Sequence, residues 1–277
     1  MDDLSVMAYE MRKDVLDMIC RAGTGHIGGD FSVMEILTDL YFRQMNISPE
    51  LMDDRDRDRF VLSKGHSVEA YYAVLAEKGF FDIKDVIAKF SKFGSKFIGH
   101  PNNKLPGIEM NSGSLGHGLP VSVGMALAGK MDDRDYRVYT VMGDGELAEG
   151  SVWQGAMAAS HYKLDNLCAV VDRNRLQISG RTEDVMAHDD LHERFGAFGW
   201  NVIDVADGND IDQLKVAFDT AKTVKGRPSV LIANTVKGKG SSVMEDKANW
   251  HHKVPSGEEL AQIRKELADR KEAALRG

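Results

Sequence analysis

Apolar and polar positions in the first half of the chain repeat with the period of an α-helix. In residues 5–21 the apolar positions are Met7, Met11, Val15, Met18 and Ile19. Gly23 stands where such a helix would end. Similar patterns predict helices over about 32–45, 67–79 and 119–131, the last of them rich in Gly, Ala and Val. We therefore expect packed interior helices in this half.

From residue 137 onward the pattern changes to short β-rich runs separated by helical stretches. The predicted strands are 138–142, 167–171, 201–205 and 229–235. This alternation is typical of a parallel sheet with crossover helices. Parallel sheets bind ligands outside the carboxyl ends of their strands. The chemistry is therefore expected just after these runs.

The chain closes with a predicted helix over about 256–276, opened by the capping box Ser256-Gly257-Glu258-Glu259. No repeat, low-complexity tract or linker marks an internal boundary. We therefore expect one α/β domain over 1–277, a parallel β-sheet flanked by helices.

Composition narrows the class of protein. The 277 residues carry 35 Lys and Arg against 43 Asp and Glu, a formal charge of -8 that argues against a nucleic-acid partner. The acidic start Met1-Asp2-Asp3-Leu4 lacks the basic residues of a signal peptide, and no apolar run approaches the roughly 20 residues of a membrane span. Cys20 and Cys168 lie in apolar segments and are expected to be free thiols. We expect a cytoplasmic protein.

The strongest chemical signal follows the predicted strand 138–142. Gly143-Asp144-Gly145-Glu146 ends this strand, and Asn174 follows the next one. The spacing from Asp144 to Asn174 suits one strand-helix-strand unit, so both side chains can offer oxygen atoms to one point. Carboxylate, amide and main-chain oxygens are ligands of Mg²⁺, which completes its octahedron with diphosphate oxygens. The glycines leave room for phosphates to approach the backbone.

The segment Gly143-Asp144-Gly145-Glu146-Leu147-Ala148-Glu149-Gly150-Ser151-Val152-Trp153, continued by Asn174-Arg175-Leu176, closely resembles the thiamine-diphosphate motif of transketolases. The resemblance implies that Asp144, Asn174 and the main-chain oxygen of Leu176 bind Mg²⁺. It implies that Gly145 and Glu146 lie at the thiamine diphosphate, in the diphosphate-binding (PP-domain) fold of that family.

Further motifs of the same family follow in the expected order. They are Gly25-His26, Phe60-Val61-Leu62-Ser63-Lys64-Gly65-His66, Gly99-His100-Pro101, Gly113-Ser114-Leu115-Gly116 and Trp250-His251. The resemblance implies three catalytic residues: His26, His100 and His251. It implies that the cofactor also contacts His66, Gly113, Ser114, Leu115, Asn174, Lys237 and His251. The positive charge of Lys237 suits a place near the diphosphate.

Members of this family transfer a two-carbon ketol unit from a ketose to an aldose. The chain lacks a recognisable counterpart of the family's second domain, which carries the glutamate that activates the cofactor, and of its third, C-terminal domain. It is therefore either a fragment or one subunit of a split enzyme, and the capped terminal helix favours the split enzyme. We expect a partner subunit carrying the pyrimidine-binding and C-terminal domains, in an α₂β₂ heterotetramer.

Two positions depart from the family pattern. His117 stands where many members have glutamine, and Ile27 stands where they have proline. Both adjoin the predicted pocket, so the identity of the sugar stays open. Alternative interpretations are the α subunit of a 2-oxo-acid dehydrogenase, a deoxyxylulose-phosphate synthase or a non-catalytic cofactor-binding subunit. The histidines favour a transketolase, and the intact Asp144 and Asn174 favour catalysis.

Other patterns are interpreted as structural. Gly23-Thr24-Gly25-His26-Ile27-Gly28 matches the dinucleotide-binding spacing, but it follows a helix instead of a strand. The stretch 53–59 alternates aspartates with arginines that would oppose a cation, so a solvated turn is expected. The segment 188–192 has no third cluster of metal ligands nearby and is expected to be a surface loop or helix start. His161 is expected to be an ordinary residue at a helix end.

Overall fold

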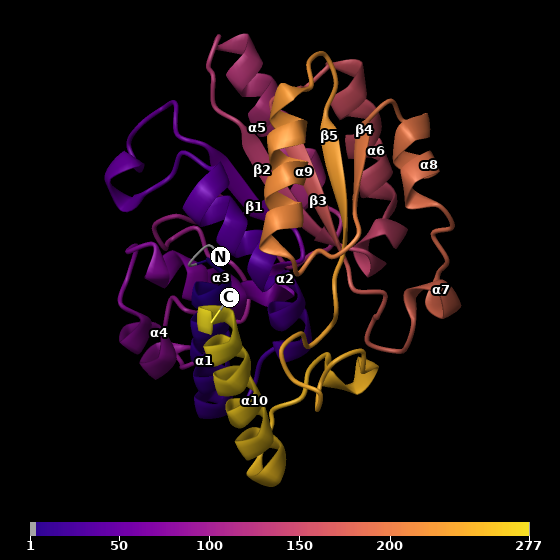
Figure 1. Cartoon of the computed structure of the whole chain (residues 1–277). Helices are drawn as coiled ribbons and strands as arrows, with labels where there is room; N and C mark the ends of the chain where they lie inside the picture. Colours follow the sequence, from indigo (N-terminus) through magenta and orange to yellow (C-terminus); the bar gives the residue numbers. More distant parts are fainter. Residues whose placement is uncertain (1–3, 277) are drawn as a thin grey trace.

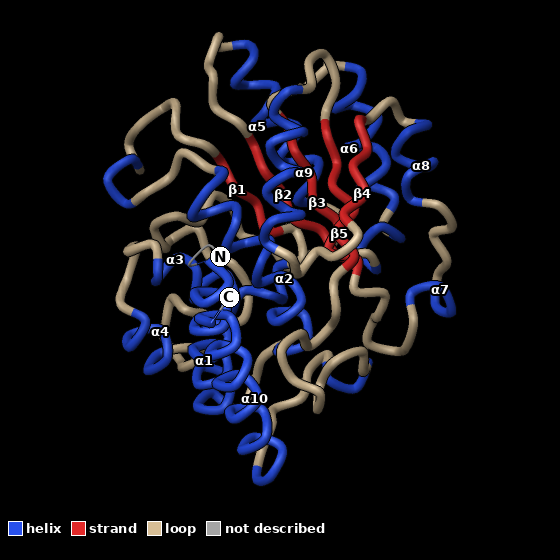
Figure 2. Tube along the Cα trace, viewed as in Figure 1, coloured by secondary structure: helices blue, strands red, loops and turns tan. Residues whose placement is uncertain are grey.

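The computed structural model of the chain describes residues 4–276, so Met1–Asp3 and Gly277 lie outside the description. A parallel sheet runs through the molecule with helices on both faces (Figure 1, Figure 2). Its strands are β1 (Arg59–Leu62), β2 (Val138–Gly143), β3 (Leu167–Arg173), β4 (Asn201–Val205) and β5 (Ser229–Asn234), in the order β1-β2-β3-β5-β4.

The central strands end side by side. Gly143 at the end of β2 pairs with Asp172 of β3, and Arg173 pairs with Asn234 at the end of β5. Because the three strands are parallel, the loops that follow them leave the same edge of the sheet. This is the edge at which the sequence predicts the ligand site.

Each face of the sheet has its own core. One cluster joins the sheet to α1 (Leu4–Ala22), α2 (Ile27–Asp39), α3 (Val68–Glu77) and α9 (Ile211–Thr223). The second joins it to α5 (Gly118–Met131), α6 (Gly150–His161) and α8 (Leu191–Ala197). Tyr139 and Val141 belong to the first cluster, while Val138 and Met142 belong to the second. Burial on both faces explains the nearly continuous apolar runs of the strands.

The terminal helix α10 (Gly257–Arg276) lies alongside α1 (Figure 1). Arg264 pairs with Asp17 across this contact, and Ile263 and Leu267 are buried in the first core. The predicted terminal helix is therefore part of the packed structure. No helix within residues 4–276 is long and apolar enough to cross a membrane. Both cysteines are free, as expected.

Two elements differ from the predicted ones. The helix predicted from about residue 32 begins at Ile27, because tertiary packing that buries every residue of α2 outweighs the low helix propensity of Gly28 and Gly29. Its last part, Leu40–Gln44, is a π-helix. The pattern does not predict β1, since an edge strand this short gives little periodicity. The short helices α4 (Ile83–Lys89) and α7 (Thr182–Val185) complete the set of α-helices.

The charged stretch 53–59 is only partly the solvated turn that was expected. Arg57 and Asp58 are buried, and the Asp58 carboxylate accepts the main-chain N–H groups of Asn46 at 2.8 Å and Arg137 at 2.7 Å. The end of the stretch therefore anchors β1 to the body of the protein. Among the described residues, no group of three or more His, Cys, Asp or Glu side chains is placed to hold a metal ion.

Candidate active site

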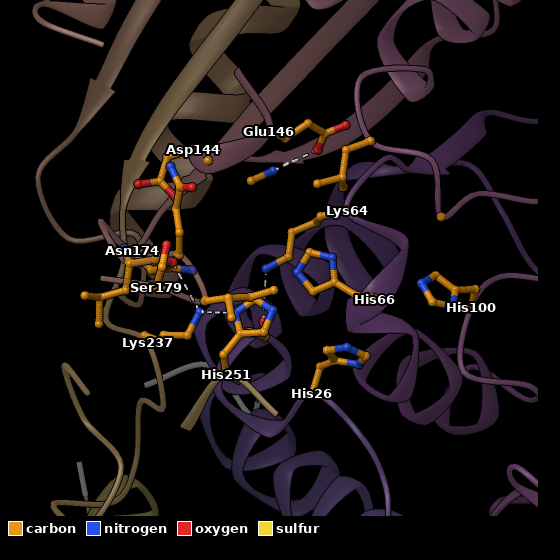
Figure 3. Close-up of a pocket in the computed structure, with 18 residues that line it drawn as sticks. His26, Lys64, His66, His100, Asp144, Glu146, Asn174, Ser179, Lys237 and His251 are labelled. Atoms are coloured by element: carbon orange, nitrogen blue, oxygen red, sulfur yellow. Dashed lines mark hydrogen bonds between the residues drawn. The ribbon is translucent and has the colours of Figure 1, made fainter. Parts of the chain in front are cut away.

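A cavity of about 400 Å³ opens at the carboxyl edge of the sheet (Figure 3). It gathers side chains from segments far apart in the sequence. The sequence-predicted residues that line it are His26, His66, His100, Gly113, Leu115, Asp144, Gly145, Glu146, Asn174, Leu176, Lys237 and His251. Ser114 does not line it and is exposed on the adjoining loop. Tertiary structure thus brings together nearly all of the predicted site.

The oxygen donors predicted for a metal lie in one wall of the cavity. Asp144 directly follows β2, and its Oδ2 accepts the Arg175 N–H and the Thr182 hydroxyl, both at 2.9 Å. Asp144 therefore touches the turn that carries Asn174 and Leu176. Arg175 has a φ of 63°, and this left-handed residue turns the chain sharply between Asn174 and Leu176.

The chemistry of this wall fits Mg²⁺. It offers a carboxylate, an amide oxygen and a main-chain carbonyl, which are hard ligands of the kind that Mg²⁺ prefers. Asn174 is oriented by its Nδ2 group, which donates to Ser32 Oγ at 3.2 Å, and its Oδ1 accepts the Leu176 N–H at 3.1 Å. At Gly145 an added Cβ would lie 2.8 Å from Gln177 Cγ, so the wall needs glycine there.

Two buried cations stand beside the oxygen donors. Lys237 Nζ donates to the Leu176 carbonyl at 3.2 Å and lies 3.0 Å from His251 Nδ1. Burial, together with the nearby charge of Lys64, lowers the pKa of Lys237 to about 8. Lys64 donates to the Gly29 carbonyl at 3.1 Å and is paired with buried Asp172. Positive charge beside oxygen ligands suits an anion such as a diphosphate.

The opposite side of the cavity is formed by imidazoles, with Lys64, Lys237 and His251 between the two sides (Figure 3). His26 is at the centre of this group. Its ring centroid lies 5.4 Å from His66, 6.3 Å from His100, 5.7 Å from His251 and 4.7 Å from His252. The close packing of rings of one kind makes each of them sensitive to the charge of the others.

Burial is the main reason that the imidazoles of this group stay neutral. It lowers the pKa of His26 to about 4 and that of His251 to about 3, and it holds the pKa of His66 well below the usual range. Neighbouring imidazoles and lysines act in the same direction. Near neutral pH these rings can therefore each donate one hydrogen bond and accept another.

Sequence reasoning missed two residues of this site. Lys64 belongs to a quoted motif but received no role, and it lines the cavity. His252 is exposed beside the cavity, and its Nε2 lies 3.4 Å from Thr24 Oγ1. The only sequence signal for His252 is its position next to His251. Its contact with His26 depends on folding that joins segments more than two hundred residues apart.

The carboxylate of Glu146 is engaged within the protein. Oε1 accepts the Gly116 N–H at 2.8 Å and the Ser63 hydroxyl, and Oε2 accepts the Gly143 N–H at 3.1 Å. Glu146 thus ties the loop that carries Gly113 to the end of β2. Its visible role is to hold the cavity wall in place.

The two departures from the family pattern do not face the cavity. Ile27 is fully buried in the first core. His117 is exposed at the start of α5, with Nδ1 3.0 Å from the Leu115 carbonyl. The expectation that both adjoin the pocket is therefore wrong for their side chains, because a neighbour of a lining residue can point the opposite way.

The patterns interpreted as structural mostly behave as expected. The glycine-rich segment 23–28 joins α1 to α2 and follows no strand. Asp190 caps α8 by accepting the N–H groups of His192 and Glu193, and His161 is exposed at the end of α6. His188 differs, because it is buried instead of lying on the surface.

Known proteins with similar sequences were found along the whole chain. The family model described as "Transketolase, thiamine diphosphate binding domain" matches residues 4–274. One of the two named subunits of apulose-4-phosphate transketolase from Phocaeicola vulgatus is 46% identical and covers 97% of this chain and 95% of its own. The 6-deoxy-6-sulfo-D-fructose transketolase subunit SqwG of Clostridium sp. is 42% identical and covers 90% of both chains.

Longer proteins match over part of their length. The solved structure of transketolase from Leishmania mexicana superposes with a TM-score of 0.89 at 29% identity, covering 97% of this chain and 42% of that one. The present chain thus spans less than half of the length of that transketolase.

Proposed function

Because the chain belongs to the transketolase family through its thiamine diphosphate-binding domain, we propose that it is the cofactor-binding subunit of a two-subunit transketolase. One observation carries the proposal. The cavity joins a wall of oxygen donors to a group of neutral imidazoles, in a chain that spans nearly the full length of relatives named as single transketolase subunits. The reaction is transfer of a two-carbon ketol unit from a ketose to an aldose. We also propose that the whole chain is one such domain and that it acts in the cytoplasm.

The oxygen wall is the proposed cofactor site. Asp144, Asn174 and the Leu176 carbonyl hold Mg²⁺, and Lys237 with Lys64 supplies positive charge for the diphosphate. The remaining proposed contacts are His66, Gly113, Ser114, Leu115, Gly145, Glu146 and His251. Thiamine diphosphate, when bound, supplies the chemistry that breaks and forms the carbon-carbon bond next to the ketose carbonyl.

The proposed catalytic residues are His26, His100 and His251. Since the lysine ammonium faces Nδ1 of His251, the proton of this ring is on Nε2, where it can be donated to a substrate oxygen. His26 and His100 are lowered in pKa by burial and can accept a proton from a sugar hydroxyl or return it. Three neutral groups around one cavity allow proton transfer at different oxygens of one sugar.

The names of the relatives narrow the substrate class. One is named for a phosphorylated sugar and another for a sulfonated one. We propose that the donor of this enzyme is likewise a ketose with an anionic substituent, such as a sugar phosphate.

A partner subunit fits the exposed surface of α5 and α6. The helix α5 has no charged residue before Lys130, and Val121 is 39% exposed. Met157 of α6 is 54% exposed, and the two helices touch where a Cβ on Gly155 would lie 3.2 Å from the Pro120 nitrogen. Both helices start next to cavity loops. We propose that this surface, Val121, Gly124, Ala128 and Met157, binds the partner with the pyrimidine-binding and C-terminal domains, and that the assembly is α₂β₂.

The test is a two-carbon transfer assay with thiamine diphosphate and Mg²⁺. The chain is assayed alone and mixed with the separately produced partner subunit, with sugar phosphates as donor and acceptor. Activity in the mixture alone supports the proposal. Full activity of the isolated chain contradicts the need for a partner, and release of CO₂ from a 2-oxo acid instead of ketol transfer contradicts the reaction class.

A further inference from the structure

Directly behind His26, two acidic residues are buried against each other. Asp30 is in the first turn of α2, and Glu69 is in the first turn of α3. Both side chains belong to fully buried residues, at 0% exposure. Their carboxyl groups lie within hydrogen-bonding reach of one another. Two buried acids in contact need an explanation, because burying one unpaired charge is already costly.

Each acid satisfies the start of the helix that carries the other. Glu69 Oε1 accepts the main-chain N–H of His26 at 3.3 Å, and Asp30 Oδ1 accepts the N–H of Ala70 at 3.0 Å. His26 and Ser67, the residues at the N-caps of α2 and α3, make no capping bond with their own side chains. The two acids therefore cap the helices reciprocally. The positive ends of both helix dipoles stabilise negative charge at this point.

The second oxygen of each acid is left without a donor. Asp30 Oδ2 and Glu69 Oε2 are buried and find no hydrogen-bond partner within residues 4–276. A proton placed between the two carboxyl groups gives both groups a partner at once. It also leaves a single negative charge, which the two helix starts can hold.

Nearby cations are already engaged. Lys64 is the cation whose charge acts on Asp30, and it is paired with Asp172. On α1, which packs against both helices, Arg12 is paired with Glu35. On α9, Lys222 donates to the Gln44 carbonyl. The remaining titratable neighbours are Tyr72 of α3, whose pKa is raised by burial and by Glu69, and the neutral rings of His26 and His66.

We propose that Asp30 and Glu69 share one proton and act as a positioning pair that fixes His26 relative to His66. Asp30 belongs to the helix that starts at His26, and Glu69 follows His66 by one short turn. The approach of Glu69 depends on Gly25, because a Cβ there would lie 2.7 Å from Oε1. The pair thus joins the two histidine-bearing segments through buried hydrogen bonds. Its importance for turnover rests on the function proposed above; its protonation does not.

The shared proton has a thermodynamic consequence of defined sign. Burial raises the pKa of Asp30 to about 8 and holds that of Glu69 well above its usual range. In the unfolded chain both acids ionise near pH 4. Between these limits the folded protein holds one more proton, so stability is highest at low pH and is lost as the pH rises toward 8. The buried histidines act in the opposite direction below about pH 6.5, so only a comparison of variants isolates the pair.

The first experiment compares the pH dependence of urea unfolding for the wild-type chain and Asp30→Asn/Glu69→Gln. The amides keep the size of both side chains, and each can still accept the main-chain N–H. From pH 5 to pH 8 the unfolding constant of the wild type, divided by that of the variant, should rise by about tenfold per pH unit. The exposed control Asp53→Asn should leave the wild-type slope unchanged. Parallel slopes for the wild type and the double variant would overturn the shared proton.

A spectroscopic readout keeps the test open if the double variant does not fold. At pH 7 the wild-type chain should show the infrared carbonyl band of a buried protonated carboxyl group. Glu69→Gln and Asp30→Asn should each remove that band, because a single remaining carboxylate accepts the amide N–H and stays ionised. A wild-type spectrum without the band, or a band that persists in both variants, contradicts the inference.

The positioning role is tested in the enzyme reconstituted with its partner. Glu69→Ala should lower kcat by about tenfold to a hundredfold with little change in KM, whereas Glu69→Gln, which still accepts the His26 N–H, should restore most of it. Equal rates for alanine and glutamine variants would overturn positioning. If the wild-type mixture shows no ketol transfer, the proposed function fails, and the stability and infrared results still decide whether the proton is shared.

Discussion

The ammonium group of Lys237 lies 3.0 Å from Nδ1 of His251. An ammonium group can only donate, so Nδ1 must be the unprotonated nitrogen of the ring. The contact therefore selects the tautomer of His251 that carries its proton on Nε2. Together with burial it also keeps this histidine uncharged, although the histidine lies in the most cationic part of the cavity.

Replacing Lys237 should make His251 easier to protonate. Burial and the charge of Lys237 lower the pKa of His251 to about 3, so Lys237→Met should raise it by about one pH unit or more. Burial remains in the variant, so the pKa should stay below 6.5. Titration of the ring followed by NMR measures the change. Lys239→Met on the same loop is the control, and an unchanged His251 in Lys237→Met would contradict the assigned tautomer.

Asp144 should be essential for metal-dependent cofactor binding. It is the one charged side chain among the three proposed metal ligands, so Asp144→Ala should abolish Mg²⁺-dependent binding of thiamine diphosphate in calorimetry. Asp144→Asn keeps an acceptor for the Arg175 N–H and the Thr182 hydroxyl and should weaken binding without unfolding the chain. Asp53→Ala should bind normally. Wild-type affinity in both Asp144 variants would refute the metal assignment.

A charge on the apolar surface of α5 should disrupt assembly with the partner. In the proposed complex Val121→Glu would bury an unpaired carboxylate, at a cost of about 3 kcal/mol or roughly a hundredfold in affinity. Sedimentation of the mixed subunits measures this loss. Val216→Glu is the matched control, because Val216 is 65% exposed on α9, which packs on the other face of the sheet. Equal assembly of both variants would place the interface elsewhere.

His252 should affect how substrate is held. Its ring lies 4.7 Å from that of His26 beside the cavity, so it can contact the part of the sugar that extends outward. His252→Ala should lower kcat/KM by about threefold to tenfold, mainly through KM, as expected for one lost hydrogen bond. Steady-state rates with several donors measure this effect. His192→Ala, an exposed change outside the cavity lining, is the control, and unchanged kinetics with every donor would exclude the contact.

Local patterns were sufficient for most elements of the fold. The buried strands β2, β3 and β5 are runs of apolar residues, and α1 has an apolar stripe at helical spacing, so sequence neighbours alone indicate them. The short edge strand β1 and the buried glycine start of α2 escaped prediction. Both depend on packing against elements that are distant in sequence.

For the site, the sequence by itself determined which chemistry is possible. Asp144 and Asn174 follow adjacent strands, and the order of the strands along the chain limits where they can meet. Only the tertiary structure decided which groups touch. The contact of His252 with His26, the pairing of Lys64 with Asp172, and the burial of Asp30 against Glu69 each join segments that no local period relates. The reason is physical: a period reports which face of an element is apolar, whereas the partner of a buried polar group is set by the packing of whole elements.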